Sequence, residues 1–290
     1  MDCLGYTKAD GHLPNGSTHE LIGYVYQYPD FASPKSLPVS LRDLVGEAYD
    51  SDDPKTPSLD ERLNLARHLA VALYQLQCAG WVHRKISSYN VIFFRDRATD
   101  ELDLSHPFLM GWQYSRPDDQ RRIYPSESAS PGVGDLDMYV HRSRIVDIDR
   151  LKRFPRFRKS FDIYSLGIIF VEIAFWEPIM ALAKEKERKV MVKFESIHSE
   201  YYAGDWWDTI RKTAKEELAP EMGVAYRDAA LFCLEGENPK DEKEDDSAYW
   251  KERHWDESDD PYYVETDFEE IGLEKQFYWR VLKALERFRI

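Results

Sequence analysis

The stretch HRKISSYN, at positions 83–90, holds the side chains of this chain that are best suited to chemistry. Lys85 carries an ammonium group, which cannot accept a proton at neutral pH and so cannot serve as a general base. Asn90 offers one neutral oxygen, a poor Mg²⁺ site when alone; the alternative is a loop asparagine bonded to its own backbone. We interpret His83 and Arg84 as structural residues that pack against and bridge the loop.

The segment Ser58–Gly80 is predicted to be the helix that leads into this loop. Ser58 and Glu61 have the spacing of a capping box. Gly80 stands where a left-handed C-terminal cap would lie. Apolar residues recur at intervals of three and four, which predicts one buried face: Leu59, Leu63, Ala66, Ala70, Leu73 and Leu76.

Two short strands and a buried helix are predicted after the loop. Val91–Phe94 and Pro107–Trp112 are apolar and strand-like. Ser160–Trp176 is apolar on nearly every side, and a helix of that kind is buried at the centre of a domain. Asp162 lies near its start, where buried N–H groups need partners and favour an anion.

The N-terminal 30 residues are predicted to form a β-hairpin. Cys3–Thr7 and Glu20–Tyr28 are the expected strands, and Asn15-Gly16 is a hairpin turn signal. A phosphate-binding loop is the alternative for these glycines, but no helix start follows them.

Further helices are predicted from apolar periodicity at 41–48, 196–218, 222–234 and 273–288. The aromatic group Tyr201, Tyr202, Trp206 and Trp207 either fills the core or forms a docking surface. The loop at 116–131 contains SESASP (Ser126–Pro131), either a phosphorylation site or a plain solvated loop.

These features together resemble the protein-kinase superfamily. His83-Arg84 with Asn90 is similar to the catalytic-loop motif HRDxxxxN, and FDIYSLG is similar to the start of the central helix of the kinase large lobe. The order of elements is also similar to that of the kinase large lobe: a capped helix, the loop, two strands, a long loop and a buried helix. The resemblance covers most of residues 3–288 and is nearest to fungal kinase-like proteins of the heterokaryon-incompatibility type.

The resemblance implies roles for individual residues. Lys85 stands at the position of the catalytic base and Asn90 at that of the second metal ligand. Asp162 would accept hydrogen bonds from the loop backbone. Tyr26, Gln27 and Tyr28 stand where adenine would bind to backbone; His83, Arg84 and Gly111 would be structural.

The principal metal ligand of a kinase has no counterpart in this sequence. In one register Gly111, Trp112 and Gln113 replace the Asp-Phe-Gly motif; in the other Gly111 is its glycine and Leu109 replaces the aspartate. Neither register supplies a carboxylate to Mg²⁺.

The resemblance implies an α+β, mainly α fold: a kinase-like large lobe with a remnant hairpin of the small lobe. Residues 1–30 would be the hairpin and hinge, and residues 31–290 the large lobe, with a mobile acidic insertion at 235–270. A complete small lobe needs roughly 70 residues. The glycine-rich loop and the strand with the clamping lysine have no candidate.

Composition narrows the classes of partner. The chain has 290 residues and a net charge of −14, which disfavours nucleic acid and anionic membranes. The basic, Phe-bearing stretch Arg150–Lys159 is a local exception. No apolar run or signal sequence indicates a membrane, and three cysteines without CxxC spacing predict neither disulfides nor zinc. We expect a cytoplasmic protein.

The leading hypothesis is a pseudokinase: a catalytically impaired kinase-like domain, without a cofactor, that regulates or binds a protein partner. The alternative is an atypical ATP- and Mg²⁺-dependent Ser/Thr protein kinase whose N-terminal segment is missing. A further hypothesis is that the acidic residues 241–260 fold onto the basic stretch Arg150–Lys159. Such a surface contact would be screened by salt.

Overall fold

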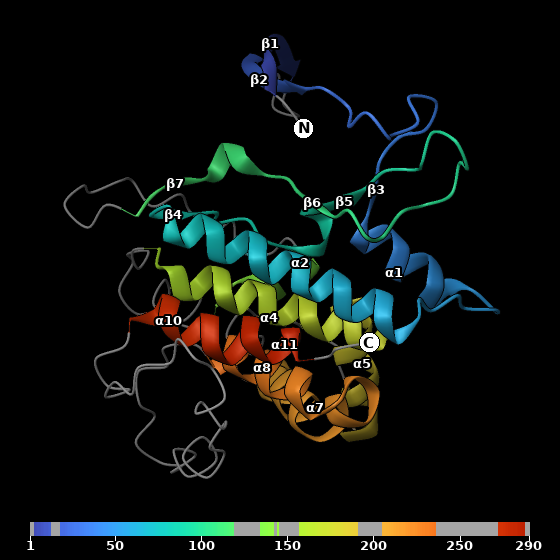
Figure 1. Cartoon of the computed structure of the whole chain (residues 1–290), viewed down its shortest axis with the longest axis vertical. Coiled ribbons are helices and arrows are strands. Elements are labelled where there is room, and N and C mark those ends of the chain that lie inside the picture. Colours follow the sequence, from blue (N-terminus) through green and yellow to red (C-terminus); the bar gives the residue numbers. More distant parts are fainter. Residues whose placement is uncertain are drawn as a thin grey trace.

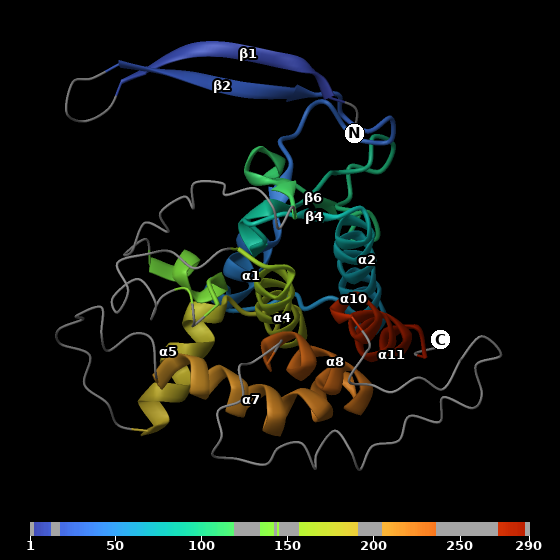
Figure 2. The same ribbon diagram turned by 90° about the vertical axis from the view of Figure 1, so that its left-hand side faces the viewer.

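The computed structural model describes residues 3–12, 18–118, 134–141, 144, 157–190, 205–235 and 272–287. This part of the chain is mixed α and β and mainly helical, as the sequence predicts (Figure 1). A body of packed helices carries short strands along one side, and a long hairpin stands beyond that side (Figure 2).

The secondary structure elements follow one another in a simple order. The strands are β1 (Cys3–His12), β2 (Thr18–Tyr26), β3 (Val39–Ser40), β4 (Trp81–Val82), β5 (Val91–Phe93), β6 (Phe108–Leu109) and β7 (Arg116–Pro117). The α-helices are α1 (Leu41–Asp50), α2 (Leu59–Cys78), α4 (Lys159–Phe175), α5 (Ile179–Val190), α7 (Asp205–Met222), α8 (Val224–Glu235), α10 (Leu273–Phe277) and α11 (Lys283–Glu286). A short π-helix, Tyr278–Leu282, joins α10 to α11, and short 3-10 turns lie at Ser88–Asn90, Trp112–Tyr114 and Gly134–Tyr139.

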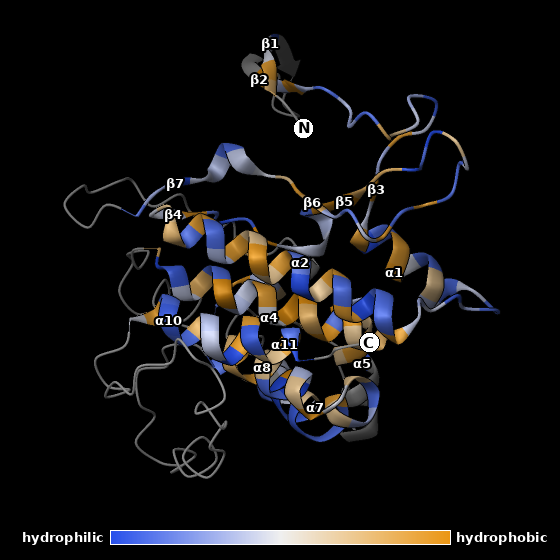
Figure 3. Cartoon of the chain, viewed as in Figure 1, coloured by the Kyte–Doolittle hydropathy of each residue, from blue (hydrophilic) through white to orange (hydrophobic). Residues whose placement is uncertain are grey.

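Helix α4 is the centre of the body. Every residue from Ser160 to Ala174 is buried, which confirms the prediction from its continuous apolar sequence. It packs against α2, α7 and α8 (Figure 3). At Gly167 the backbone of α8 comes so close that an added Cβ would lie 2.9 Å from the Cβ of Cys233.

Helix α2 begins and ends as its sequence predicts. Ser58 and Glu61 form both hydrogen bonds of the capping box. Gly80 has φ +76°, the left-handed conformation expected after the last turn. The predicted buried face is correct at its centre, whereas Leu59 is exposed at the first turn and Leu76 is half-buried.

The N-terminal hairpin is confirmed, but its strands have different bounds. The ladder runs on through Lys8↔Ile22 to His12↔Thr18, so the residues predicted to begin the turn still pair. The second strand ends at Tyr26, leaving Gln27 and Tyr28 outside it. Composition alone did not show how far this pairing extends.

Two small antiparallel sheets frame the loop at 83–90. One has the order β3-β5-β6, and the other joins β4 to β7. The strand expected at Pro107–Trp112 is shorter, Phe108–Leu109, because the chain turns at Gly111 into a 3-10 turn.

Trp206 and Trp207 are buried, which confirms the core interpretation for these two. Tyr201, Tyr202, Ser126–Pro131, residues 150–156 and the acidic segment 236–270 lie outside the described residues. No described helix is long and apolar enough to cross a membrane.

Candidate functional site

Asp162 fixes the loop at 83–90 to the centre of the body. Its two carboxylate oxygens accept the backbone N–H groups of His83, at 2.6 Å, and Arg84, at 2.8 Å. Arg84 has φ +76°, an uncommon conformation for a residue with a side chain. Burial raises the pKa of Asp162 to about 7, against the effect of these bonds and of the Arg84 and Arg144 cations.

His83 is a buried packing residue. The edge of its ring meets Trp112, with the two ring centroids 5.0 Å apart. Burial lowers the pKa of His83 to about 4, so the imidazole is neutral near pH 7. Its Nδ1 accepts the backbone N–H of Lys85 at 3.4 Å. Through its ring contact His83 packs the loop against the segment that follows β6.

The position of the expected base holds an exposed cation. The Nζ atom of Lys85 lies 5.3 Å from the centre of the Tyr114 ring, within the range of a cation–π contact. Its backbone carbonyl accepts the Asn90 amide Nδ2–H at 2.6 Å. Asn90 therefore braces the loop backbone, in agreement with the alternative left open for it.

Gly111 brings the next strand against the loop. The backbone N–H of Met110 donates to the Asn90 carbonyl at 2.7 Å. A Cβ on Gly111 would lie 3.2 Å from Asn90 Nδ2 and 3.3 Å from His83 Cε1, and the residue has φ +97°. Gly111 is thus the residue beside the Asn90 amide, and Trp112 is the residue against His83.

The side chains here do not fit a Mg²⁺ site. Asn90 supplies one neutral oxygen, and the residue beside it is a glycine. Mg²⁺ takes carboxylates and demands near-octahedral geometry. The described residues contain no group of three or more His, Cys, Asp or Glu that could hold a metal ion.

The expected adenine-binding segment lies where the hairpin joins the body. Tyr26 ends β2, and the Tyr28 ring packs edge-on against Phe94, just after β5, with centroids 5.2 Å apart. Nucleotide binding at Tyr26, Gln27 and Tyr28 stays a prediction.

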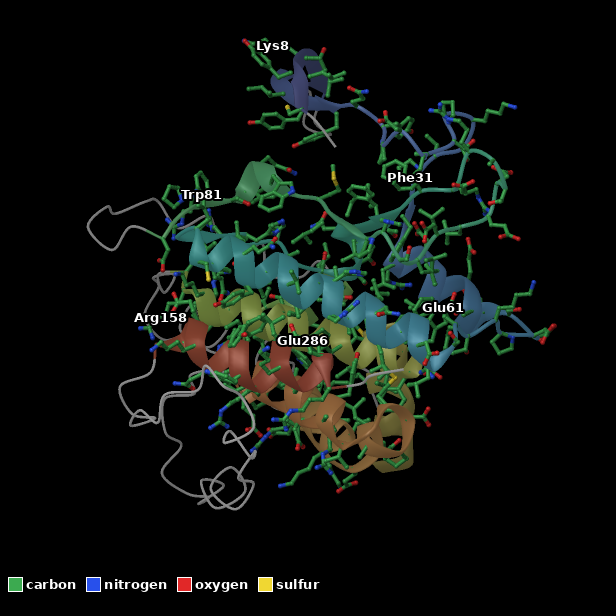
Figure 4. The ribbon with its side chains drawn as sticks, viewed as in Figure 1. Lys8, Phe31, Glu61, Trp81, Arg158 and Glu286 are labelled. Atoms are coloured by element: carbon green, nitrogen blue, oxygen red, sulfur yellow. The ribbon has the colours of Figure 1, made fainter. Side chains whose placement is uncertain are left out.

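Exposed aromatic side chains, not foreseen from the sequence, lie within and next to the loop. Trp81, Tyr89 and Trp112 are each about two-fifths exposed, at 41%, 40% and 40%. They come from β4 and from the 3-10 turns before β5 and after β6, and Figure 4 shows Trp81 at the end of α2. Of the three, Trp112 comes from outside the loop and reaches it through its contact with His83.

Phe157, from the basic stretch, also lies beside the loop. It is buried, and the guanidinium groups of Arg84 and Arg144 lie over its ring at 5.7 and 4.9 Å. Phe157 is therefore a packing residue, and the nucleic-acid interpretation of 150–156 falls outside the described residues.

A second buried carboxyl lies deeper in α4. Glu172 Oε1 accepts the Tyr139 hydroxyl at 2.7 Å and the Ile179 N–H at 3.0 Å. Ser88, from the loop, bonds the same Tyr139 hydroxyl at 2.7 Å. Burial raises the pKa of Glu172 to about 7. An acid inside an apolar helix was the sequence signal for this network.

No protein-family model matches the chain, and a search of curated proteins finds no relative.

Proposed function

We propose that the chain is a catalytically impaired protein-kinase-like domain that acts as a regulatory or interaction module. The observation that carries the proposal is the frame around Asp162. It holds His83 and Arg84 by their backbones and presents Lys85, not an aspartate, at the next position. A catalytic-loop arrangement without its base is what the pseudokinase hypothesis requires.

The contacts of Gly111 favour one of the two registers for the missing metal-binding motif. Its position beside Asn90, with Trp112 on the His83 ring, favours Gly111 in the place of the aspartate. A positioned base contributes typically 10²–10⁴-fold to a rate. Without the base and the metal carboxylate, we expect no phosphoryl transfer.

The exposed aromatic residues support an interaction role. Trp81, Tyr89 and Trp112 expose large apolar side chains within and next to a loop that lacks catalytic groups. Aromatic residues are enriched at protein–protein interfaces, and apolar patches often mark partner sites. The partner class that this surface fits is another protein.

A phosphotransfer assay tests the proposal. The purified chain would be incubated with γ-labelled ATP, Mg²⁺ or Mn²⁺ and general protein substrates, beside Lys85→Ala. We expect equal, background labelling in both. Labelling by the natural chain above the Lys85→Ala level would instead establish the alternative, an atypical ATP-dependent Ser/Thr kinase.

A thermal-shift titration tests nucleotide binding separately. A ligand at 100-fold excess over its Kd stabilises a protein by about 2.7 kcal/mol. We expect no rise in Tm with ATP and Mg²⁺. A rise without labelling would identify a nucleotide-binding pseudokinase, and a rise with labelling would contradict the proposal.

A further inference from the structure

The N-terminal hairpin, β1 with β2, stands apart from the helical body (Figure 2). All its side chains within 3–8 and 22–26 are exposed, except the half-buried Tyr26. The exposed fractions of Leu4, Tyr6 and Ile22 are 65%, 64% and 56%. The hairpin therefore leaves apolar side chains in water.

A hairpin of this kind needs additional partners to be stable. Tyr6 pairs directly with Tyr24, and Lys8 with Ile22, on one face. An isolated two-stranded hairpin is marginal in water, whereas three or more strands with an apolar face are stable. In the described part of the chain β2 pairs with β1 alone.

The two edges of the hairpin differ in their protection. β1 has a bulge between Cys3 and Gly5 and a lysine, Lys8; bulges and lysines are devices that block edge pairing. In β2 the segment Leu21–Tyr26 contains neither a charge nor a proline and is rich in β-forming residues. The open edge is therefore that of β2.

The distribution of charge leaves the hairpin as the place where a second copy of this chain can pair. The whole chain has a net charge of −14, which opposes self-association through most of its surface. The two strands of the hairpin contain one lysine against one aspartate and one glutamate. Their distance from the body lets the uncharged segments Leu21–Tyr26 of two copies meet while the acidic bodies stay apart (Figure 4, Lys8).

We propose that two copies pair along β2, antiparallel about a two-fold axis, to form a four-stranded sheet. A symmetric contact brings the same patch of each copy together, so the uncharged segment Leu21–Tyr26 meets itself. The residues of Leu21–Tyr26 then share an edge of about 20 Å. This contact is small, so the dimer is weak and depends on concentration. It does not rest on the proposed function, because it involves no residue of the loop at 83–90.

Sedimentation velocity of the full chain across a concentration series tests the interface. We expect a monomer–dimer equilibrium that strengthens with added salt, because salt screens the repulsion between the acidic bodies. A monomer at every concentration would overturn the proposal.

Matched lysine substitutions locate the contact. Ile22→Lys on β2 is expected to raise the dimer Kd at least about tenfold, and Val25→Lys, on the other face of the same strand, should do the same. Leu4→Lys makes an equivalent change on β1 and should leave the Kd within about twofold.

The control variant also distinguishes edge pairing from nonspecific hydrophobic association. If Leu4→Lys and Ile22→Lys weaken the dimer equally, the copies associate through an apolar face and the proposal is overturned. A dimer that persists in both Ile22→Lys and Val25→Lys would also overturn it. Circular dichroism of each variant must show the helical body unchanged. Since that body lies apart from the hairpin, we expect all three variants to fold.

Discussion

Gly111 is the residue at which the site depends most on the absence of a side chain. Its φ of +97° costs a residue with a Cβ about 1–2 kcal/mol. Its Cβ would also press on Asn90 and His83 at 3.2–3.3 Å. Overpacking typically costs a further 1–3 kcal/mol. We expect Gly111→Ala to lower the free energy of unfolding by roughly 2–4 kcal/mol.

Gly80→Ala is the matched control for that measurement. Gly80 has φ +76°, but an added Cβ would meet nothing within 4 Å. Only the backbone cost should appear, about 1 kcal/mol. Urea unfolding of both variants measures the difference. Equal losses would mean that contact with the loop does not require a glycine at position 111.

Some residues of the site were predictable and others were not. The motif around His83 and the start of the buried helix pointed to Asp162, because each is a local pattern. The contacts of Trp112 with His83 and of Tyr114 with Lys85 join segments that local patterns do not connect. Positions 111–114 were therefore recognised only as a place without a carboxylate.

At the scale of elements, the crossing of α4 and α8 sets a limit on side-chain size. A Cβ on Gly167 would lie 2.9 Å from Cys233 Cβ and 3.0 Å from the Leu234 backbone nitrogen. A helix backbone cannot yield as a side chain can. We expect Gly167→Ala to destabilise by about 1–3 kcal/mol, despite the better helix propensity of alanine.

Gly46→Ala in α1 is expected to stabilise the fold, the opposite of Gly167→Ala. The nearest atom to its Cβ is Arg42 Nη1, at 2.8 Å, the end of a flexible side chain that can move away. Helix propensity alone then favours alanine, by up to about 1 kcal/mol. Thermal unfolding of Gly167→Ala and Gly46→Ala measures whether each variant gains or loses stability. A stabilising Gly167→Ala would show that the two helices can separate without loss.

Helices were more predictable than strands in this chain. Capping residues and a period of 3.6 mark α2, and a continuous apolar run marks α4, each within its own sequence. The length of β1 depends on what β2 offers across the ladder, and Pro107–Trp112 is interrupted by a turn at Gly111. Pairing between segments is decided outside the segment itself.

For the molecule as a whole, the mainly helical class was predictable because more residues were expected in helices than in strands. The separation of the hairpin from the body was not. Ile22, Tyr24 and Val25 are residue types common in strands that cover a core, yet all three are exposed. Sequence pattern states which residues favour burial and not whether a partner is present.

Titration of buried groups gives a prediction at the scale of the whole fold. The pKa of Glu172 is about 7 in the folded state against an ordinary value of 4.5, so the folded state binds an extra proton between these values. Stability therefore falls as pH rises through this window. Asp162 acts in the same direction. Burial lowers the pKa of His83 and His141 to about 4, and their effect is opposite: stability rises between pH 4 and 6.5.

The carboxyls and the histidines have opposite effects on stability below pH 6.5. The pH profile of the natural chain therefore does not isolate the carboxyls. A comparison with Glu172→Gln isolates the contribution of Glu172. Glutamine keeps an oxygen that accepts from Tyr139 and Ile179 but never ionises. Near pH 4.5 the variant and the natural chain should have the same free energy of unfolding. Above pH 7 that of the variant should be higher, by up to roughly 3 kcal/mol. Urea unfolding at pH 5 and 8 measures this, with the exposed Glu47→Gln as control. A difference between Glu172→Gln and the natural chain that does not change with pH would show that Glu172 remains ionised inside the fold, held by cations such as Arg42.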